Sequence, residues 1–167
     1  MPGAAAPGHE GYHPTMTTGI PPATDLRLVV GFDGSPPSSR ALDAAANLLQ
    51  GRTGRIELVY VAHMPSMAAL SPAAVAEMET DFSDVEQELR TMAGAQVNDR
   101  VESWGFQRRQ GLIAEELLAA ASDIGAANPD ATVVIVVGSS SLVAHRVVGS
   151  VAVSLARHSP VPLIVVP

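Results

Sequence analysis

The chain has 167 residues, of which 47% are hydrophobic and only 4% are aromatic, so it can form one domain with an aliphatic core. It has no cysteine, which excludes disulfides, thiol nucleophiles and cysteine-ligated metals. The net charge of −7, without a basic patch along the sequence, argues against binding to nucleic acid or to an anionic membrane. No wholly apolar run is longer than Val133–Val137, far too short to span a bilayer, and we expect a soluble cytoplasmic protein.

Residues 1–24 are rich in Pro, Gly, Thr and His, a composition typical of a flexible tail. They contain no basic region ahead of an apolar stretch, so they do not resemble a signal peptide. His9 and His13 could bind a metal, but a flexible tail is the simpler interpretation. We therefore predict a single domain over residues 25–167.

The domain is predicted to begin with a strand over Leu26–Phe32, which ends at the turn Asp33–Pro36. The serine of this turn suits a helix N-cap, and its last proline suits the first helical position. Apolar residues at helical spacing predict a helix over residues ~36–50, which Gly51 ends. A second strand is predicted over Arg55–Ala62 because β-branched and aromatic residues are enriched there.

A long second helix is predicted from Pro72 to about Ser103. It carries an apolar stripe in alternating three- and four-residue steps, formed by Val75, Met78, Phe82, Val85, Leu89 and Met92. The same stretch carries six acids, which are Glu77, Glu79, Asp81, Asp84, Glu86 and Glu88. We interpret them as a solvated outer face, with a cation site as the alternative.

The second half of the chain continues the alternation, with strands predicted at 106–110, 131–137 and 161–166 and helices beginning at Ile113 and Gly149. The first of these strands is short and polar and suits the edge of a sheet. The second is an almost continuous apolar run, as expected for a central strand. Pro162 cannot donate to a ladder, so the last strand is also expected at an edge.

Strands and helices that alternate in this way predict an α/β fold with a parallel sheet and helices on both faces. In such folds a ligand binds beyond the carboxyl ends of the strands, where the strand order reverses. The residues that follow each strand are therefore the candidates for function.

Asp33 follows the first strand, where a carboxylate could accept hydrogen bonds from the amine or hydroxyl of a ligand. The alternative is that it only satisfies backbone N–H groups near the helix start. The spacing does not decide between these two roles.

The segment Gly138-Ser139-Ser140-Ser141, with Gly149-Ser150 at the next helix start, suits phosphate oxygens, because glycine permits close approach and a helix N-terminus favours an anion. An ordinary glycine- and serine-rich loop is the alternative. His145 and Arg146 lie in the same loop, either as phosphate partners or as solvated side chains.

Several chemistries are absent from the sequence. It has neither a GxxxxGK[ST] phosphate loop nor a G-x-S-x-G nucleophile motif. His63, His145 and His158 lack metal-ligand spacing, and His158 is expected to interact with a helix C-terminus. We therefore expect neither an enzyme nor a metal site.

Three stretches resemble the universal stress protein family, and with the element order they extend the resemblance over roughly residues 26–167. They are Val29–Ser35, Val136–Ser139 with Gly149–Val151, and Ser159–Val166. The resemblance implies a five-stranded parallel sheet of order 3-2-1-4-5. It also implies a homodimer, formed through the last strand at Val161–Val166.

One branch of this family binds adenine nucleotides, and the resemblance implies which residues would do so here. Asp33 and Val61 would hold the adenosine end, and the ribose and phosphates would lie against Gly138, Ser139, Ser141, Gly149, Ser150 and Val151. The chain departs from the family motif at its second glycine, where it has serine, and in the following loop, which is two residues shorter. These departures favour AMP or cyclic AMP over ATP, with Mg²⁺ as a candidate companion.

The leading hypothesis is therefore a non-enzymatic, homodimeric stress protein that binds an adenine nucleotide as a sensor or reservoir. The alternative is a nucleotide-independent interaction module of the same fold, which the shortened loop favours.

Overall fold

The computed structural model describes residues 25–62, 71–139 and 149–167. Within them the strands are β1 (Leu26–Gly31), β2 (Gly54–Ala62), β3 (Trp104–Gln110), β4 (Thr132–Gly138) and β5 (Leu163–Val166). The helices are α1 (Pro36–Leu49), α2 (Pro72–Val97), α3 (Ile113–Ala127) and α4 (Ser150–His158). The predicted tail over residues 1–24 lies outside the described residues.

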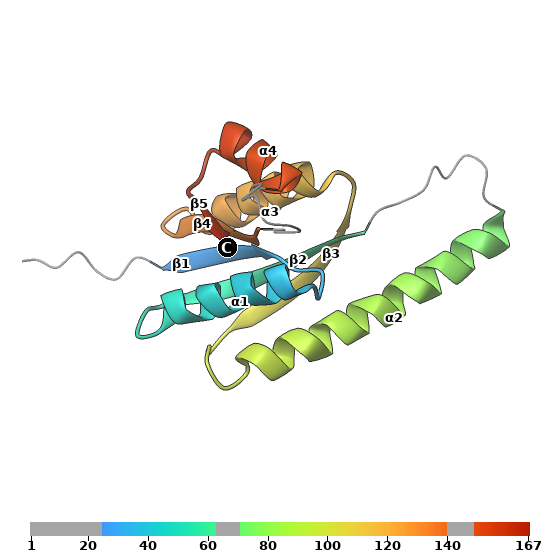
Figure 1. The fold of residues 1–167 in the computed structure, drawn as a ribbon, viewed down its shortest axis with the longest axis horizontal. Coiled ribbons are helices and arrows are strands. Elements are labelled where there is room, and N and C mark those ends of the chain that lie inside the picture. Colours follow the sequence, from blue (N-terminus) through green and yellow to red (C-terminus); the bar gives the residue numbers. More distant parts are fainter. Residues whose placement is uncertain (1–24, 63–70, 140–148) are drawn as a thin grey trace, which may run out of the picture.

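The five strands form one sheet of order β3-β2-β1-β4-β5, and every neighbouring pair is parallel. Helices α1 and α2 lie on one face of the sheet, and α3 and α4 lie on the other (Figure 1). This confirms the predicted α/β class and strand order. The two edge strands are β3 and β5. The polar sequence of β3 and the proline before β5, Pro162, indicated these positions.

The side chains of alternate strand residues divide the core into two layers. Leu28, Val30 and Phe32 of the β1 region face α1 and α2, whereas Val29 faces α3. Strand β4 supplies both layers from one unbroken apolar run, in which all five residues from Val133 to Val137 are buried. The sheet centre is therefore covered on both faces, as its sequence predicted.

Helix α1 begins as its sequence predicts. Ser35 is the N-cap, its side chain accepts the N–H of Ser38, and Pro36 opens the helix. Gly51 follows the helix end with φ of 70°, in the left-handed region that glycine enters readily.

The predicted end of α2 at about Ser103 is wrong, because the helix ends at Val97. There the Val97 carbonyl accepts both the Arg100 and the Val101 N–H. The Arg100 side chain then turns back to bond Asp43 on α1. The chain thus reaches β3 at Trp104, two residues earlier than predicted, whereas β5 starts two residues later, at Leu163.

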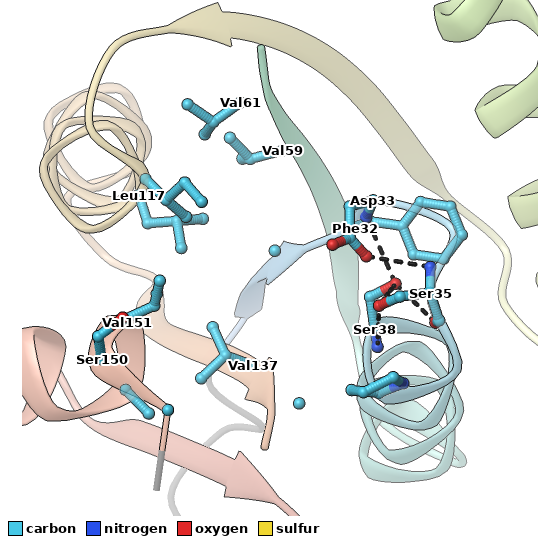
Figure 2. A pocket seen from close by; sticks show the side chains of 16 residues that line it. Phe32, Asp33, Ser35, Ser38, Val59, Val61, Leu117, Val137, Ser150 and Val151 are labelled. Carbon is cyan, nitrogen blue, oxygen red and sulfur yellow. Dashed lines mark hydrogen bonds between the residues drawn. The ribbon is translucent and has the colours of Figure 1, made fainter. Parts of the chain in front are cut away.

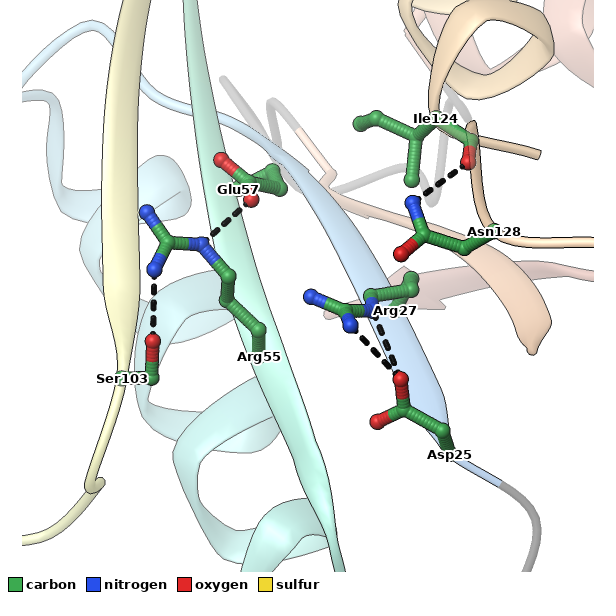
Figure 3. A network of polar contacts seen from close by, with 7 residues as sticks. All are labelled: Asp25, Arg27, Arg55, Glu57, Ser103, Ile124 and Asn128. Atoms are coloured by element: carbon green, nitrogen blue, oxygen red, sulfur yellow. Dashed lines mark hydrogen bonds and ion pairs between the residues drawn. The ribbon is translucent and has the colours of Figure 1, made fainter. Parts of the chain in front are cut away.

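Arginines near the amino ends of the strands are already paired (Figure 3). Arg27 donates two hydrogen bonds to Asp25, and Arg55 donates to Glu57 and to Ser103. These pairs neutralise their own positive charge, so the arginines form no open basic patch. Among the described helices, none combines the length and apolar character needed to cross a membrane.

Candidate functional site

A pocket of about 200 Å³ opens at the carboxyl ends of β1 and β4, where the strand order reverses. Its walls come from the ends of β1, β2 and β4 and from the first turns of α1, α3 and α4 (Figure 2). This is the place where open parallel sheets bind ligands.

Asp33 lies on one side of the pocket, at the end of β1. Its Oδ1 accepts the N–H of Ser35 at 3.0 Å, and its own N–H points to the Ser38 hydroxyl at 3.4 Å. Burial raises the pKa of this carboxyl, but the hydrogen bonds from Ser35 and Ser38 outweigh it and leave the pKa below its ordinary value. Asp33 is therefore an ionised acceptor, held by the turn it belongs to.

The start of α4 lies across the pocket from Asp33 (Figure 2). Its N-cap is Gly149, which brings no side chain to accept the first N–H groups of the helix. Ser150 and Val151 follow and also line the pocket. With no side-chain cap among the described residues, these N–H groups and the positive end of the helix dipole make this side suitable for a phosphate or another anion.

Gly138 lies at the floor of the pocket, and the packing around it requires a glycine there. A Cβ placed on it would lie 2.1 Å from the Pro37 carbonyl oxygen and 2.3 Å from the carbonyl carbon. The end of β4 can therefore reach the first turn of α1 only without a side chain at this position. The sequence pattern suggested that this glycine admits a ligand, but the neighbour that requires it is the chain itself.

An apolar wall completes the pocket on the α3 side. Val59 and Val61 come from β2, and Ile113 and Leu117 come from the first turns of α3. Ile113 is 48% exposed although it borders the pocket, so it forms part of the rim. Val61 is the one residue of this wall that was predicted from the sequence. Ile113 could have been predicted too, because it follows the end of a strand, where a ligand site is expected in this fold.

Six of the eight predicted site residues line the pocket, which are Asp33, Val61, Gly138, Gly149, Ser150 and Val151. Ser139 does not line it, and its N–H instead donates to the Val166 carbonyl at 2.7 Å. Ser141, with His63, His145 and Arg146, lies outside the described residues.

The described residues contain no cluster of three or more acids and histidines that could hold a metal ion. Five of the six α2 acids are exposed, as interpreted, whereas Glu86 is half-buried and pairs with Arg90. The exposed Glu79 pairs with Arg108. His158 lies in the last turn of α4 with Nδ1 2.9 Å from the Ser154 carbonyl oxygen, as expected for a histidine at a helix C-terminus.

The fold and the crevice define a parallel α/β domain with a ligand-sized pocket at the switch point of its sheet. The chain belongs to the universal stress protein family, whose family model matches residues 26–167. None of the curated proteins matches the chain.

Solved structures resemble it over nearly their whole length. A universal stress protein in complex with cAMP is 22% identical with a TM-score of 0.61, and the match covers 87% of this chain and 98% of that one. A universal stress protein family member from Burkholderia pseudomallei is 26% identical with a TM-score of 0.59, covering 84% and 95%. An Arabidopsis thaliana family protein with AMP bound is 12% identical with a TM-score of 0.58, covering 84% and 90%.

Proposed function

We propose that this chain is a non-enzymatic stress-response protein of the cytoplasm that binds an adenine nucleotide as a sensor or reservoir. The observation that carries the proposal is the pairing of Asp33 with the open N-terminus of α4 across one pocket. A nucleotide has hydrogen-bond donors at its adenosine end and negative charge at its phosphate end. The two sides of the pocket are complementary to these two ends.

The orientation of the ligand follows from this complementarity. The adenosine end lies toward Asp33, which accepts from a hydroxyl or amine, and against the apolar wall of Val61 and Ile113. The phosphate lies at Gly149 and Ser150, where the N–H groups of α4 point. The related proteins that hold cAMP and AMP support a nucleotide as the ligand.

The size of the pocket favours a monophosphate. Its volume of about 200 Å³ is below the roughly 300–1,000 Å³ that ligand sites usually have. This agrees with the short loop before Gly149 in the sequence. AMP and cyclic AMP are therefore preferred over ATP, with or without Mg²⁺.

The absence of an enzymatic role is proposed on the composition of the pocket. Among the described residues that line it, Asp33 is the only titratable side chain. General acid–base chemistry needs a second group to return the proton, and nucleophilic catalysis needs a base beside the nucleophile. The described part of the pocket contains neither arrangement.

A thermal-shift panel with ATP, ADP, AMP and cyclic AMP, each with and without Mg²⁺, tests the proposal. A ligand at about 100 times its Kd adds about 2.7 kcal/mol of stability, which is a shift of several degrees. AMP and cyclic AMP are expected to give the largest shifts. Flat curves at millimolar ligand would instead support the nucleotide-independent interaction module.

We further propose that the protein is a homodimer paired through β5. Within the part of the chain that the structure describes, this strand has a neighbour on one side only. The Pro162 and Val166 carbonyls accept from β4, so the alternate residue Val165 directs its backbone N–H to the open edge. Val165 is also 36% exposed. An open edge of this kind favours pairing with another strand.

Val165→Pro removes this outward N–H but leaves the β4 ladder intact, so it should give a folded monomer. Val165→Ala keeps the N–H and should remain dimeric. Light scattering measures the mass of each variant, and circular dichroism checks its fold. A folded, dimeric Val165→Pro protein would show that β5 pairing is not the interface.

A further inference from the structure

Helix α2 has an apolar stripe that the fold uses only in part. Leu89 is buried at 5% exposure, and Ala93 and Val97 are fully buried against the sheet and α1. By contrast, Val85 and Met92 are 37% and 41% exposed. The part of α2 that packs against the core therefore begins at about Leu89. The predicted apolar stripe begins more than two turns earlier, toward the amino end of the helix.

Met78, Val85 and Met92 form a ridge on α2, in which Val85 and Met92 are exposed and Met78 is half-buried. They follow one another at intervals of seven residues, so they lie in line along one side of the helix. This spacing matches the seam that one helix offers to another. Two of the three are methionines, whose flexible side chains adapt to a partner surface.

A row of acids runs beside this ridge. Glu77, Asp81, Asp84 and Glu88 follow steps of four, three and four residues, so they share one side of the helix. All four are exposed, and none makes an ion pair or a side-chain hydrogen bond with another described residue. In contrast, Glu79 and Glu86 lie on the other side of the ridge and pair with Arg108 and Arg90.

The amino-terminal half of α2 also extends past the sheet (Figure 1). The helix has 26 residues, which is about 39 Å, whereas the neighbouring β3 has only seven. Among the described side chains of this half, Phe82 lies beside the Arg108 guanidinium of β3, at 5.4 Å from the ring centre, and Glu79 pairs with the same arginine. An isolated helical stretch gains little stability in water, so such an extension is typical of a surface that another molecule covers.

We propose that the outer face of α2, formed by the ridge Met78-Val85-Met92 and the acid row Glu77-Asp81-Asp84-Glu88, docks a basic amphipathic helix of a partner protein. The ridge takes the apolar side of that helix, and the acids pair with its lysines or arginines. Two copies of this face would bring eight carboxylates together, which disfavours a second copy of the chain. The same acids disfavour an anionic membrane.

The face lies beside the nucleotide-site turn but does not depend on ligand. A Cβ added to Gly34 would lie 2.8 Å from the Leu89 side chain and 3.5 Å from the Met92 sulfur. None of the residues of the ridge or of the acid row lines the pocket. The partner helix is therefore expected to bind the protein with an empty pocket, and the inference stands independently of the proposed nucleotide.

A fluorescent peptide of about three heptads, with leucine at the a and d positions and lysine at the e and g positions, tests the proposal by fluorescence anisotropy. A matched control peptide carries glutamate in place of lysine. The lysine peptide should bind the full chain, and the glutamate peptide should not. Raising NaCl from about 0.05 M to about 0.5 M should weaken the complex, because exposed charges are screened.

Two variants of α2 separate the contributions. Val85→Thr with Met92→Gln removes the apolar ridge at unchanged charge and should weaken binding by about tenfold. Asp81→Asn with Asp84→Asn and Glu88→Gln keeps the ridge and should weaken binding by roughly threefold to a hundredfold. The matched control makes the same charge change elsewhere, with Asp99→Asn, Glu102→Gln and Asp130→Asn, and should bind as the wild type does.

Four results would overturn the proposal. The first is that both peptides bind equally well, and the second is that the ridge variant binds the lysine peptide as tightly as the wild type does. The third is that the control variant loses as much affinity as the charge variant. The fourth is that the wild type sediments as a dimer and the ridge variant as a monomer in sedimentation velocity. The last result would assign the face to a second copy. Thermal melts confirm folding, and if the ridge variant fails to fold, the charge variant and its control still decide.

Discussion

Replacing Gly149 by aspartate should separate the stability of the protein from its ligand binding, moving them in opposite directions. Gly149 is the N-cap of α4 with φ of −57° and ψ of 153°, a conformation open to any residue. Aspartate at this position can accept the N–H groups of the first helical turn and interact with the helix dipole. The ligand-free protein should therefore gain about 0.5–1 kcal/mol, a rise in Tm of about 1–4 °C.

The same carboxylate occupies the groups proposed to bind the phosphate and repels its charge. Each hydrogen bond to a charged group contributes about 1.5–3 kcal/mol, so the loss of two reduces affinity by about a hundredfold or more. At a ligand concentration of about 100 times the wild-type Kd, the stabilisation falls from about 2.7 to about 0.4 kcal/mol. The ligand-induced shift in Tm should thus almost disappear.

The assay is differential scanning fluorimetry of both proteins with AMP and with cyclic AMP, supported by calorimetric titration. Gly149→Asn is the matched control, because it caps the helix without adding charge and should retain more of the shift than aspartate does. A Gly149→Asp protein with the full wild-type shift would refute the proposed position of the phosphate.

Three further predictions concern the walls of the pocket. Gly138→Ala should cost about 2 kcal/mol or more, because its Cβ would collide with the Pro37 carbonyl 2.1 Å away, and urea denaturation measures the loss. Ser35→Ala removes the side-chain cap of α1 and should cost about 1 kcal/mol in the same assay, while Ser35→Asp should cost little. The carboxyl of Asp33 should titrate below its ordinary pKa of 3.8 in an NMR titration. Because the folded-state pKa of Asp33 is lowered, its contribution to stability is complete above about pH 4 and is lost as the pH falls through the folded-state pKa. The difference in stability between the wild type and Asp33→Asn should therefore shrink in that range. A difference that does not change with pH would contradict this prediction.

Most of the fold could be predicted from local sequence patterns. The apolar run before the turn at Asp33 predicted a strand, the continuous apolar run of β4 predicted a central strand, and a proline indicated an edge position for β5. The order of the strands came from the resemblance to the family. The end of α2 was not predicted, because no glycine or proline follows Val97 closely in the sequence and the helix ends through the bonds of the Arg100 and Val101 N–H groups to the Val97 carbonyl. The start of β3 was missed because Trp104 and Gly105 carry no alternating pattern of their own.

The site was predictable where a strand ends and a helix begins, and less so where distant elements meet. Asp33 and Gly149 follow from their places in the chain. Leu117 lies four residues inside α3, and only the packing of that helix over β1 brings it to the pocket. The buried hydroxyl of Ser38, which supports the Asp33 turn, likewise needed the three-dimensional structure to be recognised.

The contact between Gly138 and Pro37 bears on how sequences of this fold should be compared. A glycine that the backbone of the first helix demands will be kept by chains that bind a ligand and by chains that have lost the ability, so its presence cannot distinguish them. Gly149 is different, because its φ and ψ would accept almost any side chain. A glycine retained there has no such backbone reason, and it is the more informative of the two when function is judged from sequence.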